Sequence, residues 1–107
     1  RLAEIDPLTG IANRRAAMSA LDRSLVTHRE EGRSTALLLF DIDDFKGVND
    51  RHGHPAGDKV LRRIAELAQR QARLGDCVAR IGGEEFLWIR PDCDEDCAHD
   101  AAERLRW

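Results

Sequence analysis

The sequence RIGGEEF at residues 80–86 lies between two runs that are typical of β-strands, CVARI at 77–81 and FLWI at 86–89. Two glycines between such runs predict a tight hairpin, because glycine accepts the positive φ of primed turns. The carboxylates of Glu84 and Glu85 then lie at the hairpin tip, where like charges repel each other unless a cation such as a divalent metal shares the site. A solvent-exposed acidic turn is the alternative interpretation.

A second acidic strand end lies upstream. The apolar run at residues 35–40 predicts a fully buried strand that ends in acidic residues. Side chains alternate along a strand, so Asp41 and Asp43 should point to the same side. If the hairpin lies beside this strand, Asp41 and Glu84 could hold one or two Mg²⁺ ions, with Lys46 near the substrate phosphates. The alternative is a strand end with solvated acids and a helix cap.

The motif NDRHGHPAGD at residues 49–58 contains a predicted loop at residues 51–58, whose glycines let the backbone approach a ligand closely. The Asp58 carboxylate can accept hydrogen bonds from N1–H and the exocyclic amine of guanine, and Asn49 can add an amide contact. Adenine offers an acceptor at N1, so such a site would discriminate between the bases. Alternatively, Asp58 is only the N-cap of the helix that follows.

The remaining chain predicts four helices around these strands. Asn13 should cap a first helix and Gly32 should end it, a short helix should cover residues 45–50, a third should follow Asp58, and the last should cover residues 95–105. This order predicts an α+β fold with a largely antiparallel sheet. A sheet of three strands should have one bare edge, which a further strand after the end of this chain would cover.

Composition narrows the class of protein. The chain has 107 residues, which fits one small domain, and it is 42% hydrophobic and 35% charged with a net charge of -3. Interspersed charges argue against a broad basic face for nucleic acid or membrane contact, and no apolar run reaches membrane-spanning length. Cys77, Cys93 and Cys97 are expected to be reduced thiols, since a zinc site would need a second ligand pair. Taken alone, Arg73 and Asp76 predict a surface ion pair.

Four motifs in order cover nearly the whole chain: DPLTGIANRR at 6–15, FDIDDFK at 40–46, NDxxGHxxGD at 49–58 and RIGGEEF at 80–86. Together they resemble the GGDEF domain, the diguanylate cyclase family, in its GGEEF variant. The resemblance implies a fold like that of nucleotidyl cyclases and polymerase palm domains. It also implies that residues 1–107 form a partial domain, missing the last strands and a helix that carry a lysine and an arginine for the phosphates.

The resemblance implies condensation of two GTP molecules into cyclic di-GMP with release of two pyrophosphates, using Mg²⁺ or Mn²⁺ and a homodimer of facing domains. It also implies an upstream sensory or receiver domain and a cytoplasmic location, either free or as the cytoplasmic part of a membrane-bound sensor. The competing hypothesis is a non-catalytic GGDEF module that binds GTP or cyclic di-GMP as a sensor.

By the same resemblance, the metal ligands are Asp41, Glu84 and the backbone carbonyl of Ile42. Glu85 either lies at the metal site or assists the attacking hydroxyl, and Glu84, Glu85 and Lys46 are the catalytic residues. The residues implied in binding the substrate are Phe45, Lys46, Asn49 and Asp58. An inhibitory product site away from the catalytic centre is implied for Arg73, Asp76 and Arg104.

Overall fold

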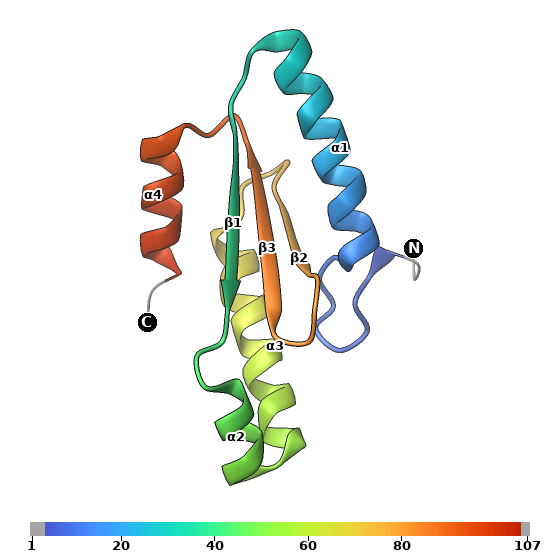
Figure 1. Ribbon diagram of the computed structural model, residues 1–107, viewed down its shortest axis with the longest axis vertical. Coiled ribbons are helices and arrows are strands. Elements are labelled where there is room, and N and C mark those ends of the chain that lie inside the picture. The colour runs from blue at the N-terminus through green and yellow to red at the C-terminus, as the bar shows by residue number, and fades with distance from the viewer. Residues whose placement is uncertain (1–3, 106–107) are drawn as a thin grey trace.

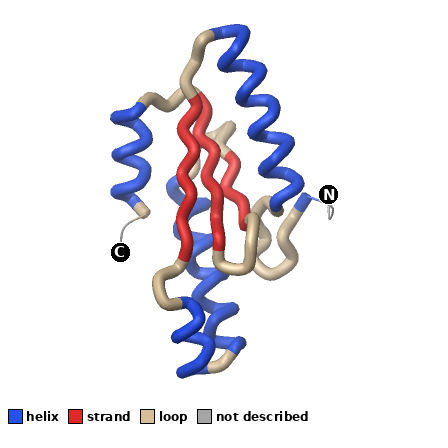
Figure 2. Tube along the Cα trace, viewed as in Figure 1, coloured by secondary structure: helices blue, strands red, loops and turns tan. Residues whose placement is uncertain are grey.

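The structure, a computed structural model, describes residues 4–105. Its elements in chain order are α1 (Arg14–Glu31), β1 (Thr35–Asp41), α2 (Phe45–His52), α3 (His54–Gln71), β2 (Cys77–Arg80), β3 (Glu85–Pro91) and α4 (Glu95–Arg104) (Figure 1). The three strands form one antiparallel sheet in the order β1-β3-β2 (Figure 2). The predicted α+β class and order of elements are therefore confirmed.

The central strand β3 organises the core on both faces of the sheet. Phe86 and Trp88 are fully buried on the face that α3 covers, where α4 also contributes to the core. Leu87 and Ile89 point to the opposite face and pack beneath α1. Because successive side chains of a strand alternate between faces, a strand buried on both faces reads as a continuous apolar run.

The ends of α1 follow the predicted capping residues. The side chain of Asn13 accepts a hydrogen bond from the backbone N–H of Ala16 at 3.0 Å. Gly32 adopts a left-handed conformation with φ of 70° and donates its N–H to the carbonyl of His28. Glycine tolerates this conformation without the steric cost that a Cβ would add.

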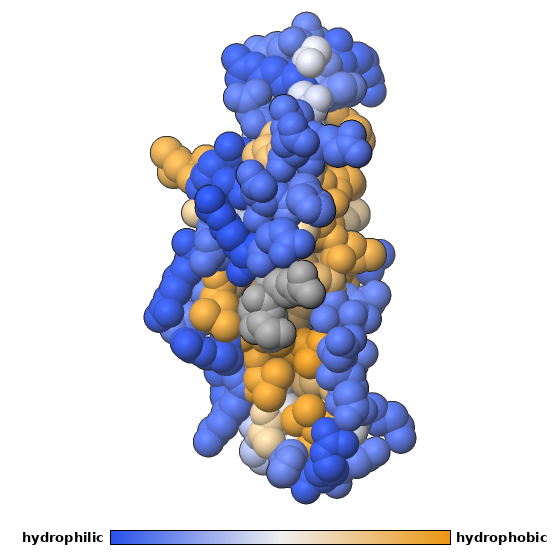
Figure 3. All heavy atoms as spheres, turned by 90° about the vertical axis from the view of Figure 1, so that its left-hand side faces the viewer, coloured by the Kyte–Doolittle hydropathy of each residue, from blue (hydrophilic) through white to orange (hydrophobic). Residues whose placement is uncertain are grey.

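The prediction that β1 is fully buried is wrong, because β1 is an edge strand. Leu37 is 52% exposed and Leu39 is 67% exposed. Among residues 4–105, β1 pairs only with β3, and a groove of about 630 Å³ separates it from α4. Apolar surface is exposed on this side of the molecule (Figure 3). The apolar run at residues 35–40 thus contains side chains of both faces, only one of which is packed.

The predicted loop at residues 51–58 is also wrong. α2 continues to His52 and α3 begins at His54, so only Gly53 separates the two helices. Gly53 turns the chain with φ of 86°, and Pro55 lies in the first turn of α3, where its missing N–H costs no helical hydrogen bond. The resulting helix pair extends beyond the end of the sheet that carries the acidic residues (Figure 1).

Two of the three cysteines are joined, which contradicts the expectation of reduced thiols. Cys93 and Cys97 form a disulfide, and Cys77 is free. The disulfide spans the N-terminus of α4, whose cap is the side chain of Asp94.

Candidate active site

The acidic end of β1 lies beside the β2–β3 hairpin. In the antiparallel register, Asp41 is directly opposite Glu85, and Glu84 is the preceding residue, in the turn. Directly opposed side chains of a β-ladder lie close together, so this pair places like charges next to each other. Asp43 follows the strand in a turn, and the expected alternation with Asp41 therefore does not extend to it.

The hairpin turn does not use the predicted primed geometry. Neither Gly82 nor Gly83 has a positive φ. A Cβ at Gly82 would come within 2.5 Å of the Glu85 carboxylate oxygen Oε1, which shows that the Glu85 side chain lies against this glycine. The glycine thus leaves room for the Glu85 side chain to lie over the turn.

Arg80 holds this turn to the N-terminal loop. Its guanidinium donates from Nε and Nη2 to the carbonyl of Gly83 at 3.0 and 2.8 Å. Its Nη1 atom also contacts the Asp6 carboxylate at 3.3 and 3.4 Å. Asp6 accepts two further hydrogen bonds, from the backbone N–H and the hydroxyl of Thr9. The backbone just before Glu84 is therefore fixed by charge-assisted hydrogen bonds.

The environment of Asp6 favours its charged form. Burial alone would raise the pKa of this carboxyl, but the hydrogen bonds from Thr9 and the nearby Arg80 charge lower the pKa below its usual value. The sequence places Asp6 in a turn and Arg80 in a strand, but it does not predict the contact between them. The sequence signal for the role of Asp6 was the Asp-x-x-Thr spacing of Asp6 and Thr9. This spacing is typical of a turn closed by hydrogen bonds to the Asp side chain.

The donor set at the hairpin end fits a hard divalent cation. Carboxylates from Asp41, Glu84 and Glu85 come from the two neighbouring strand ends, and the carbonyl of Ile42 follows Asp41. Within residues 4–105, no group of three or more His, Cys, Asp or Glu side chains forms a metal cage. Mg²⁺ commonly binds through one or two carboxylates plus substrate phosphates, so a metal that arrives with a nucleotide suits this arrangement.

Three of the predicted substrate residues, Phe45, Lys46 and Asn49, lie on α2. Lys46 is 91% exposed, and its Nζ lies 3.4 Å from Asp50 Oδ2, so the ammonium can turn toward an incoming anion. Asn49 lies against Gly57 of α3, where a Cβ would collide with its Oδ1. This Oδ1 is buried without a hydrogen-bond partner in the part of the chain described. A buried acceptor without a partner is costly, and a ligand donor would relieve that cost.

Phe45 on α2 and Asp58 on α3 flank the contact between Asn49 and Gly57. The Phe45 ring packs against Gly57, so the missing Cβ of Gly57 permits close contact between α2 and α3. Asp58 is half-buried inside α3, whose N-cap position is Gly53. The alternative role of Asp58 as a helix cap is therefore wrong. The predicted guanine residues Asn49 and Asp58 lie on two packed helices rather than on a loop.

The residues predicted for product binding differ in exposure. The Asp76 side chain is 1% exposed, whereas that of Arg73 is 42% exposed, with 3.7 Å between Nε and Oδ1. The alternative of a surface ion pair is therefore wrong, since one partner is buried. Arg104 is the exposed last residue of α4, and the structure records no contact between it and Arg73.

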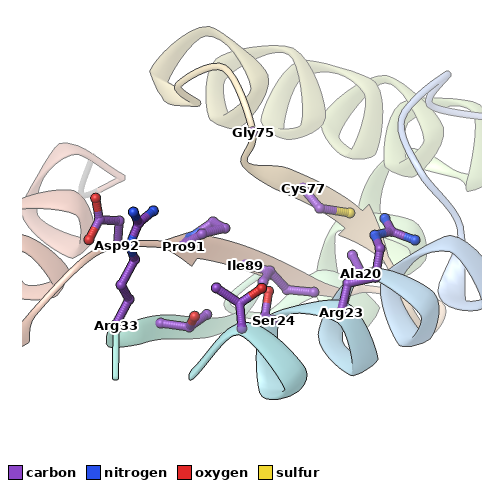
Figure 4. Close-up of a pocket in the computed structure, with 11 residues that line it drawn as sticks. Ala20, Arg23, Ser24, Arg33, Gly75, Cys77, Ile89, Pro91 and Asp92 are labelled. Atoms are coloured by element: carbon purple, nitrogen blue, oxygen red, sulfur yellow. The ribbon is translucent and has the colours of Figure 1, made fainter. Parts of the chain in front are cut away.

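A separate pocket of about 320 Å³ lies between α1 and the sheet (Figure 4). Arg23 and Cys77 line one part of it, and Arg33 and Asp92 line another. Burial raises the pKa of the Cys77 thiol, and the Arg23 charge offsets this only partly. None of the predicted catalytic or substrate residues lines this pocket, so it is distinct from the acidic hairpin end.

Residues 3–107 match the family model described as "Diguanylate cyclase, GGDEF domain". The chain belongs to the GGDEF family. Among curated GGDEF relatives, the chain is 42% identical to diguanylate cyclase DgcP of Pseudomonas aeruginosa and 43% identical to the response regulator PleD of Caulobacter vibrioides. These matches cover 94% and 98% of this chain but only 15% and 23% of the relatives.

Solved GGDEF structures agree with this assignment. The GGDEF domain of DgcB from Caulobacter crescentus, solved in complex with c-di-GMP, superposes with a TM-score of 0.95 at 40% identity, covering 99% of this chain and 60% of that one. Diguanylate cyclase SiaD from Pseudomonas aeruginosa, solved with its activator SiaC, gives a TM-score of 0.92 at 40% identity, covering 98% and 42%. None of the helices described in this GGDEF chain has the length and apolar character needed to cross a membrane.

Proposed function

We propose that the full-length protein condenses two GTP molecules into cyclic di-GMP and releases two pyrophosphates. The observation that carries this proposal is the register that sets Asp41 of β1 opposite Glu85 of the GGEEF turn in a chain of this family. Each 3′-hydroxyl would attack the α-phosphorus of the other GTP in line, forming a P–O bond while pyrophosphate leaves. Positioning and electrostatic stabilisation then provide most of the catalysis.

Asp41, Glu84 and the carbonyl of Ile42 would hold Mg²⁺ or Mn²⁺, which would neutralise charge on the phosphates. Glu85 has space over Gly82 and either joins this site or takes the proton of the attacking hydroxyl. Lys46 would exchange its exposed contact with Asp50 for a phosphate oxygen.

Guanine recognition would fall to Asn49 and Asp58, beside the ring of Phe45. The Oδ1 of Asn49 is buried and unpartnered against Gly57, so a turn of this side chain toward the ligand would give it a guanine N–H donor. Asp58 would accept from N1–H and the exocyclic amine, and adenine would leave this carboxylate without a donor. An enzyme that rejects adenine in this way should use GTP and not ATP.

A product with two phosphodiester bonds requires two half-sites, so two copies of the domain should face each other around a two-fold axis. Arg73, Asp76 and Arg104 would bind cyclic di-GMP at a separate inhibitory site, where Arg73 Nε lies 3.7 Å from Asp76 Oδ1. An upstream sensory or receiver domain would control how often two copies meet, in the cytoplasm.

The test is incubation of the full-length protein with GTP and Mg²⁺, followed by chromatographic separation of the products. Cyclic di-GMP and pyrophosphate are expected, whereas GTP that binds without turnover would indicate the sensor module. Glu84→Gln keeps the side-chain shape and removes its charge, so the rate should fall by at least ~10²-fold. Glu95→Gln, at an exposed position on α4, is the matched control and should not change the rate. Turnover by Glu84→Gln close to that of the control would contradict the metal assignment.

A further inference from the structure

The Cys93–Cys97 disulfide joins a buried sulfur to one that lies nearer the surface. Cys93 is 3% exposed, whereas Cys97 is partly exposed in the first turn of α4. Both cysteines line a hollow of about 480 Å³ beside the chain that links α1 to β1. A small molecule that enters this hollow can reach Cys97, while the protein shields Cys93.

Cys93 is attached to the sheet through its backbone. Its N–H donates to the carbonyl of Ser34 at 3.0 Å, immediately before β1. Asp92, the residue before Cys93, turns the chain with φ of 55°, a left-handed conformation that is strained for a residue with a Cβ. Because Cys97 is already within α4, the disulfide extends the attachment of Cys93 to the first turn of this helix.

The first turn of α4 has little other contact with the sheet. The helix stands beside β1 at the edge of the domain (Figure 1). None of residues 95–98 is fully buried, and Ala101 is the only fully buried residue of the described helix. The Asp94 side chain accepts a hydrogen bond from the N–H of Cys97 at 2.9 Å, but this bond is local to the helix end. The disulfide is therefore the link that holds this turn against the sheet.

We propose that Cys93 and Cys97 form a reversible exchange site for a small thiol such as glutathione, and that cleavage of their bond releases the first turn of α4 from the sheet. In a reducing compartment, an accessible disulfide is typically transient and responsive to the redox state. The exchange site lies beyond the end of β3 that is opposite to Glu85, so it is independent of the cyclase activity proposed above.

Cleavage of the bond takes two steps. A thiolate attacks the Cys97 sulfur, the S–S bond breaks, and Cys93 leaves as a thiolate that takes a proton from solvent. A second thiolate attacks the small-molecule sulfur of the mixed disulfide, which releases Cys97 and the oxidised small disulfide, so two thiols supply the two electrons. The Cys93 sulfur lies 3.8 Å from the carbonyl oxygen of Asp94, which gives the new thiol an acceptor. Oxidation runs in reverse, with Cys97 as the first nucleophile and Cys93 as the resolving thiol.

The first test identifies the reacting sulfur in the full-length protein with oxidised glutathione, using mass spectrometry of peptides. Cys93→Ser should trap glutathione on Cys97, because the resolving thiol is gone. Cys97→Ser should acquire glutathione on Cys93 at least ~10-fold more slowly, since a buried thiol is poorly accessible. Cys77→Ser removes the free cysteine and is the matched control, which should form the 93–97 bond like the unaltered protein. Equal rates at Cys93 and Cys97 would overturn the assignment of Cys97 as the attacked sulfur.

The second test measures hydrogen exchange at the amides of residues 97–100, where the hydrogen bonds of α4 begin. Exchange should be at least ~3-fold faster after reduction by glutathione than in the disulfide form, while α3 exchanges equally in both. The Cys93→Ser/Cys97→Ser protein should match the reduced form and should not respond to glutathione.

Two outcomes would contradict different parts of the proposal. If the pair stays reduced in oxidised glutathione, or stays oxidised in reduced glutathione, the exchange site is overturned. If the pair exchanges but residues 97–100 behave alike in both forms, the release of α4 is overturned and the exchange site stands. Neither outcome bears on the turnover of GTP, which is measured separately.

Discussion

The contact between Asp6 and Arg80 should make a measurable contribution to stability, because it is partly buried. The side chains are 14% and 19% exposed, and the Nη1 to oxygen distances are 3.3 and 3.4 Å. A hydrogen bond to a charged group contributes ~1.5–3 kcal/mol, and these distances lie near the long limit of such bonds. We therefore expect a coupling energy of about 1–2 kcal/mol.

A double-mutant cycle isolates this coupling. Asp6→Asn keeps the shape of the side chain, Arg80→Met keeps an unbranched apolar stem without the guanidinium, and urea unfolding of the four proteins gives the interaction energy. Arg80→Met alone should cost about 2–4 kcal/mol, since it also removes both hydrogen bonds to the carbonyl of Gly83. The m-value should stay constant across the four proteins, which would show that the denatured state is unchanged.

The pair of Arg70 and Glu66 on α3 is the matched control. Its atoms are closer, at 2.6 Å, but its side chains are 61% and 51% exposed. An exposed pair four residues apart on a helix contributes only ~0.3–0.5 kcal/mol. If the Asp6–Arg80 coupling is no larger than that of this control, the idea that partial burial strengthens the contact is refuted.

The pH dependence of stability supplies a second check on the same contact. The pKa of Asp6 is lower in the folded protein than its ordinary value of 3.8, so the folded state binds this proton less readily than the unfolded state. The stabilisation is fully present above that ordinary value and is lost as the pH falls through the lower folded pKa. Asp6→Asn should therefore remove part of the acid-induced loss of stability, as measured by urea unfolding between neutral and acidic pH.

Three further predictions concern other parts of the chain. Asp58→Ala should weaken GTP binding in calorimetry far more than metal binding, and equal GTP affinity would contradict its guanine role. Reduction of the Cys93–Cys97 disulfide, whose sequence separation is 4, should lower the free energy of unfolding by about 2 kcal/mol on loop entropy, while the Cys93→Ser/Cys97→Ser protein should not respond to reductant. Specific activity of the complete domain should rise with enzyme concentration at saturating GTP, and a fully active monomer in sedimentation would refute paired half-sites.

Sequence patterns correctly predicted the structural features that depend on residues close together in the chain. The cap at Asn13, the left-handed Gly32 and the apolar face of α3 depend on residues within one or two turns. Gly53 and Pro55 favour a loop in a sequence pattern, although proline suits the first turn of a helix, so the predicted start of α3 lies too late in the chain. The exposure of Leu39 was missed because an apolar run does not show which strand lies at a sheet edge.

In the candidate site, too, some features follow from the sequence motifs and others depend on how distant segments pair. The motifs predicted that Asp41 and the GGEEF turn meet, and the register agrees, but pairing with Glu85 rather than Glu84 depends on how the hairpin closes. One hydrogen-bond partner of Asp76 is Trp88, twelve residues along the chain, and β-pairing of the intervening segment brings them together. Such contacts depend on tertiary register, which single-sequence patterns do not specify.

The open edge of β1 has a consequence for any measurement of self-association. Within residues 4–105 no strand other than β3 pairs with β1, so in this chain its edge backbone groups and the exposed Leu37 and Leu39 form a template onto which a second β1 can add edge to edge. Two chains joined in this way would make a six-stranded sheet, and the contacts between them would not involve nucleotide. Such dimers should persist without GTP and disperse when Leu39 is replaced by lysine, whereas pairing of catalytic half-sites should strengthen with GTP and tolerate that change. An experiment that counts dimers without varying nucleotide would score both species alike.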